Sequence, residues 1–258
     1  MIDIQVNHGA ADWPTLRLAA QAAEASGYTT WWVADHLAGD VMNAPSMPEC
    51  FTTLGGLAAV TSCIGLGSLV VNVGTRHPGI VANAAATVQQ MSNGRFTLGL
   101  GAGASPTSRF VRELHALEIP VPASLDDRHQ RLIATLDLLD AMWSPDRDER
   151  YAGFPLPVPC PPVIVGVNSI TLARIASART YGINVRADHP RLREILAVTR
   201  DAARADFLRS VWAPFDESLL DPQCARRLEW AAAGVNRVVL LMFGVPDVAR
   251  IAATHVVG

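Results

Sequence analysis

The stretch MSNGRFTLGLGAG (residues 91–103) contains a helix end, a strand and a glycine-rich strand end in direct succession. Asn93-Gly94 is typical of a helix terminus, because both residue types adopt the left-handed backbone conformation at low cost. The following run, 95–100, has strand length and is mostly apolar, and Gly101 and Gly103 come directly after it. A helix that passes into a buried strand within a few residues is typical of an α/β fold.

The same alternation of strands and helices extends over the whole chain. Eight runs of strand length alternate with eight longer amphipathic stretches, which predicts a single (β/α)8 TIM barrel over residues 1–258. A doubly wound open sheet is the alternative architecture. The expected strands are 2–6, 30–34, 64–71, 95–100, 163–167, 183–186, 207–212 and 237–242. The expected helices are 12–26, 50–61, 79–92, 125–143, 169–180, 190–204, 217–233 and 246–256.

The composition excludes several classes of protein. The 258 residues are 50% hydrophobic and 17% charged, which excludes an intrinsically disordered chain. Polar and glycine residues interrupt the most apolar stretch, 57–73, so we expect no membrane span. All 21 basic residues are arginines, which excludes lysine Schiff-base chemistry and the P-loop lysine. The net charge of −3, without a basic stripe, argues against a nucleic-acid partner.

Cysteine spacing and the N-terminus both favour a cytoplasmic protein. Four widely spaced cysteines form no CxxC pair, so we expect buried free thiols in a reducing compartment: Cys50, Cys63, Cys160 and Cys224. The first residues, Met1-Ile2-Asp3-Ile4, lack the basic region and the long apolar core of an export signal.

Four histidines follow predicted strands, at the end of the barrel where active sites of this fold lie: His8, His36, His77 and His189. A metal-dependent hydrolase is disfavoured, because no His-x-His follows the first strand and no HExxH is present. We therefore expect no metal. The segment 99–104 matches the dinucleotide-binding pattern GxGxxG/A, but no helix follows it directly.

A flavin-type site fits the strand ends better. Glycines at 101 and 103 would allow close approach of a ring, and a helix N-terminus would bind a phosphate. Gly166-Val167-Asn168-Ser169, directly before the predicted helix 169–180, provides such an anion site. Simple helix capping by Asn168 and Ser169 remains an equally good explanation.

Four segments in the first half of the chain resemble the luciferase-like monooxygenases, a family that includes deazaflavin-dependent oxidoreductases. They are similar to the family's helix-one to strand-two block, its AxxTxxIxLG run, its third crossover and its LSxGRFxLGLGxG signature. The segments occur in the family's order at residues 22–36, 54–67, 76–87 and 91–103. The resemblance implies a barrel that binds FMN or the deazaflavin coenzyme F-420 at the C-terminal ends of its strands.

The resemblance also implies roles for particular residues. His36 matches a histidine beside the reacting flavin carbon, and Asp35 would orient His36 or brace the strand end. A non-prolyl cis peptide is expected at Leu69-Val70 or a neighbouring bond. Residues at the ends of the third and fourth predicted strands would contact the ring through their backbone: Leu69, Val70, Val71, Asn72, Gly101 and Gly103. The loop of Gly166, Val167, Asn168 and Ser169 would receive the phosphate.

This chain departs from the family pattern in two places. Deazaflavin-dependent sugar-phosphate dehydrogenases place a glutamate directly after GxGxG, where this chain has Ala104, so sugar-phosphate oxidation is not expected. The second half is shorter than in most members, and we expect the proline-rich connection 145–162 to shape the substrate pocket.

The sequence therefore predicts a deazaflavin-dependent oxidoreductase that transfers a hydride to or from a small organic substrate. An FMN-dependent monooxygenase is the alternative enzyme, and a non-catalytic flavin-binding or partner subunit is the alternative outside the enzymes. We expect a homodimer in the cytoplasm, with no membrane or nucleic-acid partner.

Overall fold

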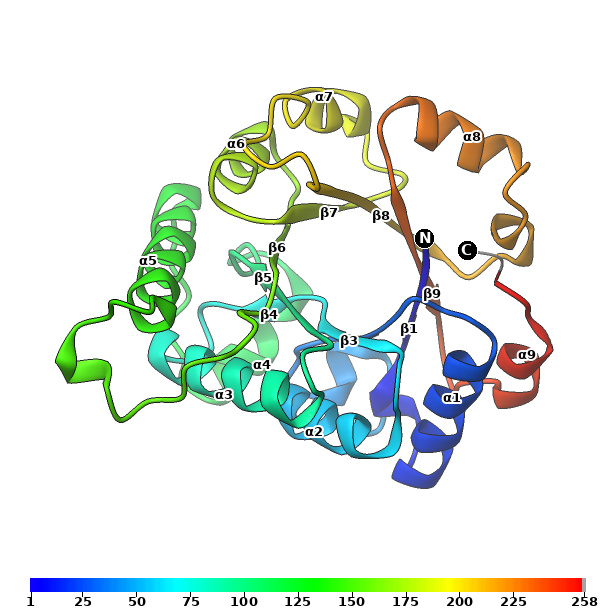
Figure 1. Cartoon of the computed structure of the whole chain (residues 1–258), viewed down its shortest axis with the longest axis horizontal. Helices are drawn as coiled ribbons and strands as arrows, with labels where there is room; N and C mark the ends of the chain where they lie inside the picture. Colours follow the sequence, from blue (N-terminus) through cyan, green and yellow to red (C-terminus); the bar gives the residue numbers. More distant parts are fainter. Residues whose placement is uncertain (257–258) are drawn as a thin grey trace.

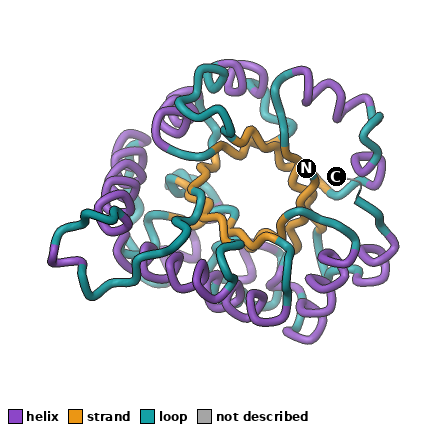
Figure 2. The backbone as a smooth tube through the Cα atoms, viewed as in Figure 1, coloured by secondary structure: helices purple, strands orange, loops and turns teal. Residues whose placement is uncertain are grey.

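A closed parallel β-barrel surrounded by helices is the architecture of the computed structural model, which describes residues 1–256 (Figures 1 and 2). The last two residues of the predicted 1–258 domain lie outside the described residues. The described strands are β1 (Ile2–Val6), β2 (Thr30–Val33), β3 (Gly65–Ser68), β4 (Val71–Asn72), β5 (Phe96–Gly101), β6 (Val163–Gly166), β7 (Gly182–Arg186), β8 (Leu208–Pro214) and β9 (Arg237–Met242).

The strand order proves that the sheet is closed. It runs β3-β2-β1-β9-β8-β7-β6-β5-β4, and a further pairing of β3 with β5 joins the two ends. Both β3 and β4 pair with β5, one after the other along its length. Together they therefore occupy a single strand position of the barrel. The predicted (β/α)8 barrel is confirmed, and the open doubly wound sheet is wrong.

The helices of the first half match the predicted ranges closely, whereas those of the second half are shorter. The helix expected at 190–204 covers only Leu192–Ala197, and the side chain of Arg209 then donates to the hydroxyl and carbonyl oxygens of Thr199. The helix expected at 217–233 divides into a 3-10 turn and a short helix, with Pro222 between them. The described α-helices are α1 (Trp13–Ala25), α2 (Cys50–Val60), α3 (Pro78–Met91), α4 (Arg112–Ala116), α5 (Leu125–Trp143), α6 (Ile170–Arg179), α7 (Leu192–Ala197), α8 (Ala225–Ala232) and α9 (Val248–Ala253).

Helix ends lie where local chemistry predicts them. Asn93 and Gly94 terminate α3 with positive φ angles of 53° and 82°. Ser124 begins α5, and its hydroxyl accepts a hydrogen bond of 2.9 Å from the amide of Asp127.

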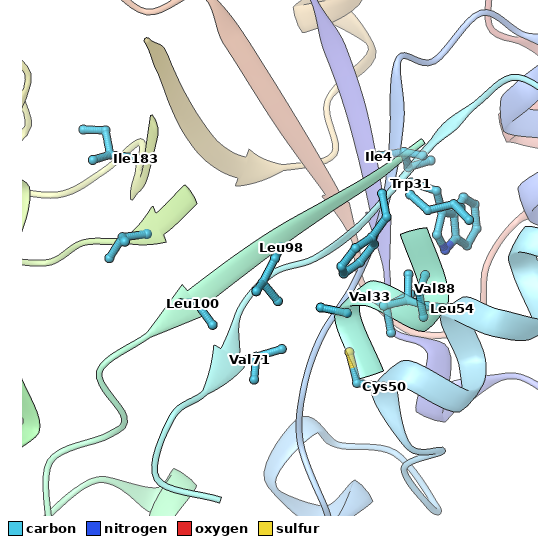
Figure 3. Packing of buried hydrophobic residues seen from close by; sticks show 14 of the residues in the cluster. Ile4, Trp31, Val33, Cys50, Leu54, Val71, Val88, Leu98, Leu100 and Ile183 are labelled. Atoms are coloured by element: carbon cyan, nitrogen blue, oxygen red, sulfur yellow. The ribbon is translucent and has the colours of Figure 1, made fainter. Parts of the chain in front are cut away.

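The main core lies between the strands and the surrounding helices. Alternate residues of each strand point outward, and Ile4, Trp31 and Leu98 pack there against helix residues such as Leu54 (Figure 3). A smaller apolar cluster, which we call the interior cluster, consists of Trp32, Leu69, Ile164 and Val239, with Val70, Leu208 and Trp212 packed against it.

The third strand of the barrel is divided into β3 and β4, although the sequence predicts one continuous strand over 64–71. The peptide bond Leu69-Val70 is cis, as the family resemblance implied. The interruption separates β3 from β4 and lies at the C-terminal end of the barrel.

The proline-rich connection 145–162 lies at the N-terminal end of the barrel, away from the strand ends predicted to carry the site. The carbonyl oxygen of Pro162 accepts from the amide of Leu98, and that of Pro159 accepts from the side chain of Gln89. The connection therefore does not border the strand ends at which the site is predicted. A connection from a helix to the next strand in such a barrel always returns to the N-terminal end.

The four cysteines are free, but only Cys50 is a fully buried thiol, while Cys63 and Cys160 are exposed. Within residues 1–256, no helix has both the length and the apolar character that crossing a bilayer requires.

Candidate active site

His36 lies just beyond β2 and is held by a carboxylate that the sequence did not reveal. The Nδ1 atom of His36 is 2.9 Å from Oε1 of Glu113, and the amides of Leu37 and Ala38 donate to Oε2 at 2.7 and 3.0 Å. The ring of Phe110 lies beside the imidazole, with 5.2 Å between the ring centroids. Because a carboxylate only accepts, Nδ1 carries the proton, and Nε2 of the neutral ring remains an acceptor.

Glu113 is buried and ionised more readily than an ordinary glutamate. Burial raises the pKa of its carboxyl, but hydrogen bonds from His36, Leu37 and Ala38 outweigh burial, so the pKa lies below its usual value. Glu113 lies on α4, a short helix that the sequence did not predict. One signal was available: the acid lies between Val111 and Leu114, which are both buried.

Asp35 braces the strand ends and makes no described contact with His36. Its Oδ2 atom accepts from the amide of Asn72 at 3.0 Å and from Nη1 of Arg76 at 2.7 Å. Arg76 also pairs with Glu49 at 2.7 Å. Of the two roles that the resemblance offered for Asp35, the geometry supports bracing of β2 against β4.

The residues predicted to contact a ring converge around Val70, whose side chain points into the barrel. A Cβ atom at Gly101 would lie 2.5 Å from Cγ2 of Val70, and one at Gly166 would lie 3.0 Å from Cγ1. These two positions require glycine because the side chain of Val70 approaches both of them closely. Gly103 differs, because it is exposed and has a positive φ of 85°.

The predicted phosphate loop lies at the start of α6. Val167 is buried, and its amide donates to the carbonyl oxygen of Asn184. Asn168 is exposed, and its carbonyl oxygen is 3.2 Å from Nε2 of His189. The hydroxyl of Ser169 caps the helix by accepting from Leu172 at 3.2 Å. Capping is thus present, while the first two helix amides have no intrahelical acceptor and still point toward the strand ends.

The remaining histidines at the strand ends do not join this group. Nε2 of His8 contacts the carbonyl oxygen of Pro48 at 3.1 Å, and burial lowers the pKa of its ring. His77 caps α3 through Nδ1. No group of three potential metal ligands occurs in the part of the chain that the structure describes.

The family model for luciferase-like monooxygenases matches residues 2–210 of the sequence. The chain belongs to this family.

Two curated relatives of this luciferase-like protein each match about half of the chain. An F420-dependent glucose-6-phosphate dehydrogenase of Beutenbergia cavernae is 33% identical over 126 residues, or 48% of this chain and 35% of that protein. A 4-hydroxyprotoasukamycin monooxygenase of Streptomyces nodosus subsp. asukaensis is 33% identical over 138 residues, or 54% of this chain and 34% of that protein. The matches thus span about a third of the length of these relatives.

The luciferase-like fold extends to nearly the whole chain. The structure of an F420-dependent secondary alcohol dehydrogenase, in complex with an F420-acetone adduct, superposes with a TM-score of 0.74. The alignment covers 97% of this chain and 96% of that one, at 18% sequence identity. The shortened helices of the second half therefore still complete the family's barrel.

The donor set of this luciferase-like protein fits a flavin-type cofactor. The amides of Ile170 and Thr171 are the first two of α6, and an anion would satisfy them. Oδ1 of Asp35 is buried and has no hydrogen-bond partner among the described residues. The apolar side chain of Val70, the N-terminus of α6 and the imidazole of His36 thus lie at one end of the barrel.

Proposed function

We propose that the protein is a deazaflavin-dependent oxidoreductase that transfers a hydride to or from a small organic substrate. The observation that carries this proposal is the pair of His36 and Glu113, which holds an imidazole at the C-terminal end of the barrel with Nε2 free to exchange a proton. The F420-dependent relatives support deazaflavin as the cofactor. When bound, the deazaflavin supplies a two-electron hydride acceptor or donor.

His36 is the acid–base residue of the proposed reaction. Nε2 takes the proton of a substrate hydroxyl, or returns it to a carbonyl oxygen, while Glu113 keeps Nδ1 protonated. Glu113 is a positioning residue, because it also fixes the loop after β2 through the amides of Leu37 and Ala38. Asp35 keeps the ends of β2 and β4 together through Asn72 and Arg76.

The cofactor would lie against two groups of residues. The backbone of Leu69, Val70, Val71 and Asn72, together with Gly101 and Gly103, would hold its ring. The loop from Gly166 to Ser169 and the first amides of α6 would hold its phosphate.

The substrate is proposed to be an uncharged small molecule and not a sugar phosphate. Ala104 follows the glycine motif where the sugar-phosphate dehydrogenases carry an acid. We also propose a homodimer. The four free cysteines support our proposal of a cytoplasmic location, because that compartment keeps thiols reduced.

An FMN-dependent monooxygenase is the second candidate function. The observation in its favour is the monooxygenase relative, whose match covers a larger share of this chain than the dehydrogenase match does. A non-catalytic flavin-binding or partner subunit is the third candidate.

Cofactor titration separates these candidates. We expect the deazaflavin to bind more tightly than FMN, measured by calorimetry or fluorescence, and to be reduced by substrate under anaerobic conditions. Tight FMN binding with oxygen consumption would instead establish the monooxygenase. Binding of neither cofactor would leave only the partner subunit.

Replacement of His36 tests the mechanism separately. His36→Ala should lower turnover at least about tenfold, within the range for general acid–base catalysis, and leave cofactor affinity nearly unchanged. Glu113→Gln should lower turnover less and alter its pH profile, because the imidazole loses its anionic partner. An unchanged rate in His36→Ala would remove this residue from the mechanism.

A further inference from the structure

An aromatic pair lies at the C-terminal ends of β8 and β9, which are neighbouring strands (Figure 1). The rings of Trp212 on β8 and Phe243 just after β9 are 6.5 Å apart and nearly perpendicular, at 87°. Phe243 is 63% exposed, and the nearby Val245 is 64% exposed. Large apolar side chains exposed together at the mouth of a barrel indicate a surface that a ligand covers.

Hydrogen bonds through Gln5 connect Trp212 to the backbone of Leu69, which is proposed to contact the cofactor ring. Its indole Nε1 donates to Oε1 of Gln5 at 2.8 Å, and Nε2 of Gln5 donates to the carbonyl oxygen of Leu69 at 3.0 Å. The indole also packs against the interior cluster, which contains Leu69 and, at its edge, Val70. The orientation of Trp212 is therefore fixed relative to the backbone that would support the ring.

The charges beside Trp212 are already neutralised. In the register of β7 and β8, Arg186 lies opposite Trp212. Its guanidinium makes two hydrogen bonds to Asp188, at 2.9 and 2.6 Å. An anionic substrate group would have to displace this bidentate pair, whereas an uncharged ring can pack on the aromatic pair without disturbing it.

We propose that Trp212 and Phe243 form a subsite for the flat, uncharged part of the substrate, and that the substrate is an aromatic ketone or the corresponding secondary alcohol. This inference rests on the proposed function, because it places the reacting carbon beside the backbone that is proposed to hold the cofactor ring. Two perpendicular rings offer a face and an edge, the two arrangements in which aromatic groups pack favourably.

Fluorine NMR of protein labelled with 5-fluorotryptophan tests this subsite directly. The chain has six tryptophans, and Trp212→Phe would assign the signal of Trp212. Acetophenone and acetone would be titrated into the protein, alone and after saturation with the deazaflavin. We expect acetophenone to shift the Trp212 signal and to bind about tenfold more tightly than acetone, a difference of about 1.4 kcal/mol. Glucose 6-phosphate should leave the signal unchanged.

Two variants make the test specific. Phe243→Ala should weaken acetophenone binding about threefold or more and leave acetone binding unchanged. Phe154→Ala is the matched control, because Phe154 is also exposed, at 42%, but lies in the connection at the other end of the barrel. Trp13 is the control signal, because this tryptophan is 44% exposed on α1.

Three results would overturn the subsite. They are an unshifted Trp212 signal under both conditions, an equal shift at Trp13, and equal effects of Phe243→Ala and Phe154→Ala. None of these results depends on turnover, so the subsite can fail while the cofactor titration still supports the proposed function. Failure of cofactor binding with a specific Trp212 shift would reject the proposed function instead.

Discussion

Two buried carboxylates, Asp3 inside the barrel and Glu113 at its mouth, have pKa values shifted in opposite directions. Burial raises the pKa of Asp3 to about 6, against the opposing effects of Arg237 and a hydrogen bond from Trp32. Glu113 is buried as well, but three hydrogen bonds hold its pKa below the usual value. The number of donors, and not burial alone, decides which carboxylate is stable as an anion.

The difference separates two regions of the molecule. Inside the barrel, Oδ2 of Asp3 accepts one side-chain hydrogen bond, from Trp32, and Arg237 approaches it only to 3.4 Å. At the mouth, Glu113 and Asp35 receive backbone amides and cationic or imidazole groups. The interior thus tolerates a charge, while the mouth is built to hold charges in fixed positions, as chemistry at a strand end requires.

The largest expected effect is at the mouth, in Arg76→Met. This change leaves the carboxylate of Asp35, which is 1% exposed, without its cationic partner. We expect the free energy of unfolding to fall by about 3–5 kcal/mol, measured by urea denaturation. Arg186→Met is the matched control, because its ion pair with Asp188 is exposed and should contribute about 1 kcal/mol or less. Equal losses would show that the mouth does not depend on buried charge.

The next effect is the pH dependence that Asp3 gives to the barrel interior. Because its pKa is about 6 in the folded protein, against an ordinary value of 3.8 for the unfolded chain, the folded form binds the proton more tightly. Its contribution to stability is therefore greatest below about pH 4 and is lost as the pH rises through 6, by about 3 kcal/mol in total. Asp3→Asn should abolish this slope in denaturation curves measured from pH 4 to 7. A slope that persists in the variant would come from other groups.

The contribution of Glu113 to stability should depend on pH in the opposite direction to that of Asp3, and Glu113→Gln tests this. The lowered pKa means that Glu113 stabilises the fold above its ordinary value of 4.5 and loses this contribution as the pH falls through the folded value. At pH 7 the variant should be about 1.5–3 kcal/mol less stable, the range for hydrogen bonds to a charged group. The deficit should shrink in acid. A deficit that is constant with pH would show that shape, and not charge, matters at this position.

The smallest expected loss of stability is at Gly101, where the side chain of Val70 packs between the barrel interior and the strand ends. Gly101→Ala should lower stability by about 1–3 kcal/mol, because the new Cβ would lie 2.5 Å from Val70. Adding Val70→Ala should recover part of that loss, and a double-mutant cycle measures the coupling. Independent, additive losses would show that the glycine is needed for a reason other than the approach of Val70.

The sequence predicted the barrel well because its signals are local. Asn93-Gly94 ends a helix through backbone conformation alone, and Ser124 begins one by capping an amide three residues later. The shortened helices of the second half were harder to predict, because the carbonyl of Thr199 is satisfied by a side chain from the next strand.

Local sequence was therefore sufficient for the strand and helix order, for the family, and for the placement of His36, Asp35 and the glycines at strand ends. Only the folded chain shows which of these groups meet. Glu113 reaches His36 across 77 positions, and the side chain of Val70 approaches Gly101 too closely for a Cβ atom there. The reason is physical: backbone conformation depends on neighbours in the chain, whereas a partner for a buried charge is found wherever the fold brings a donor within about 3 Å.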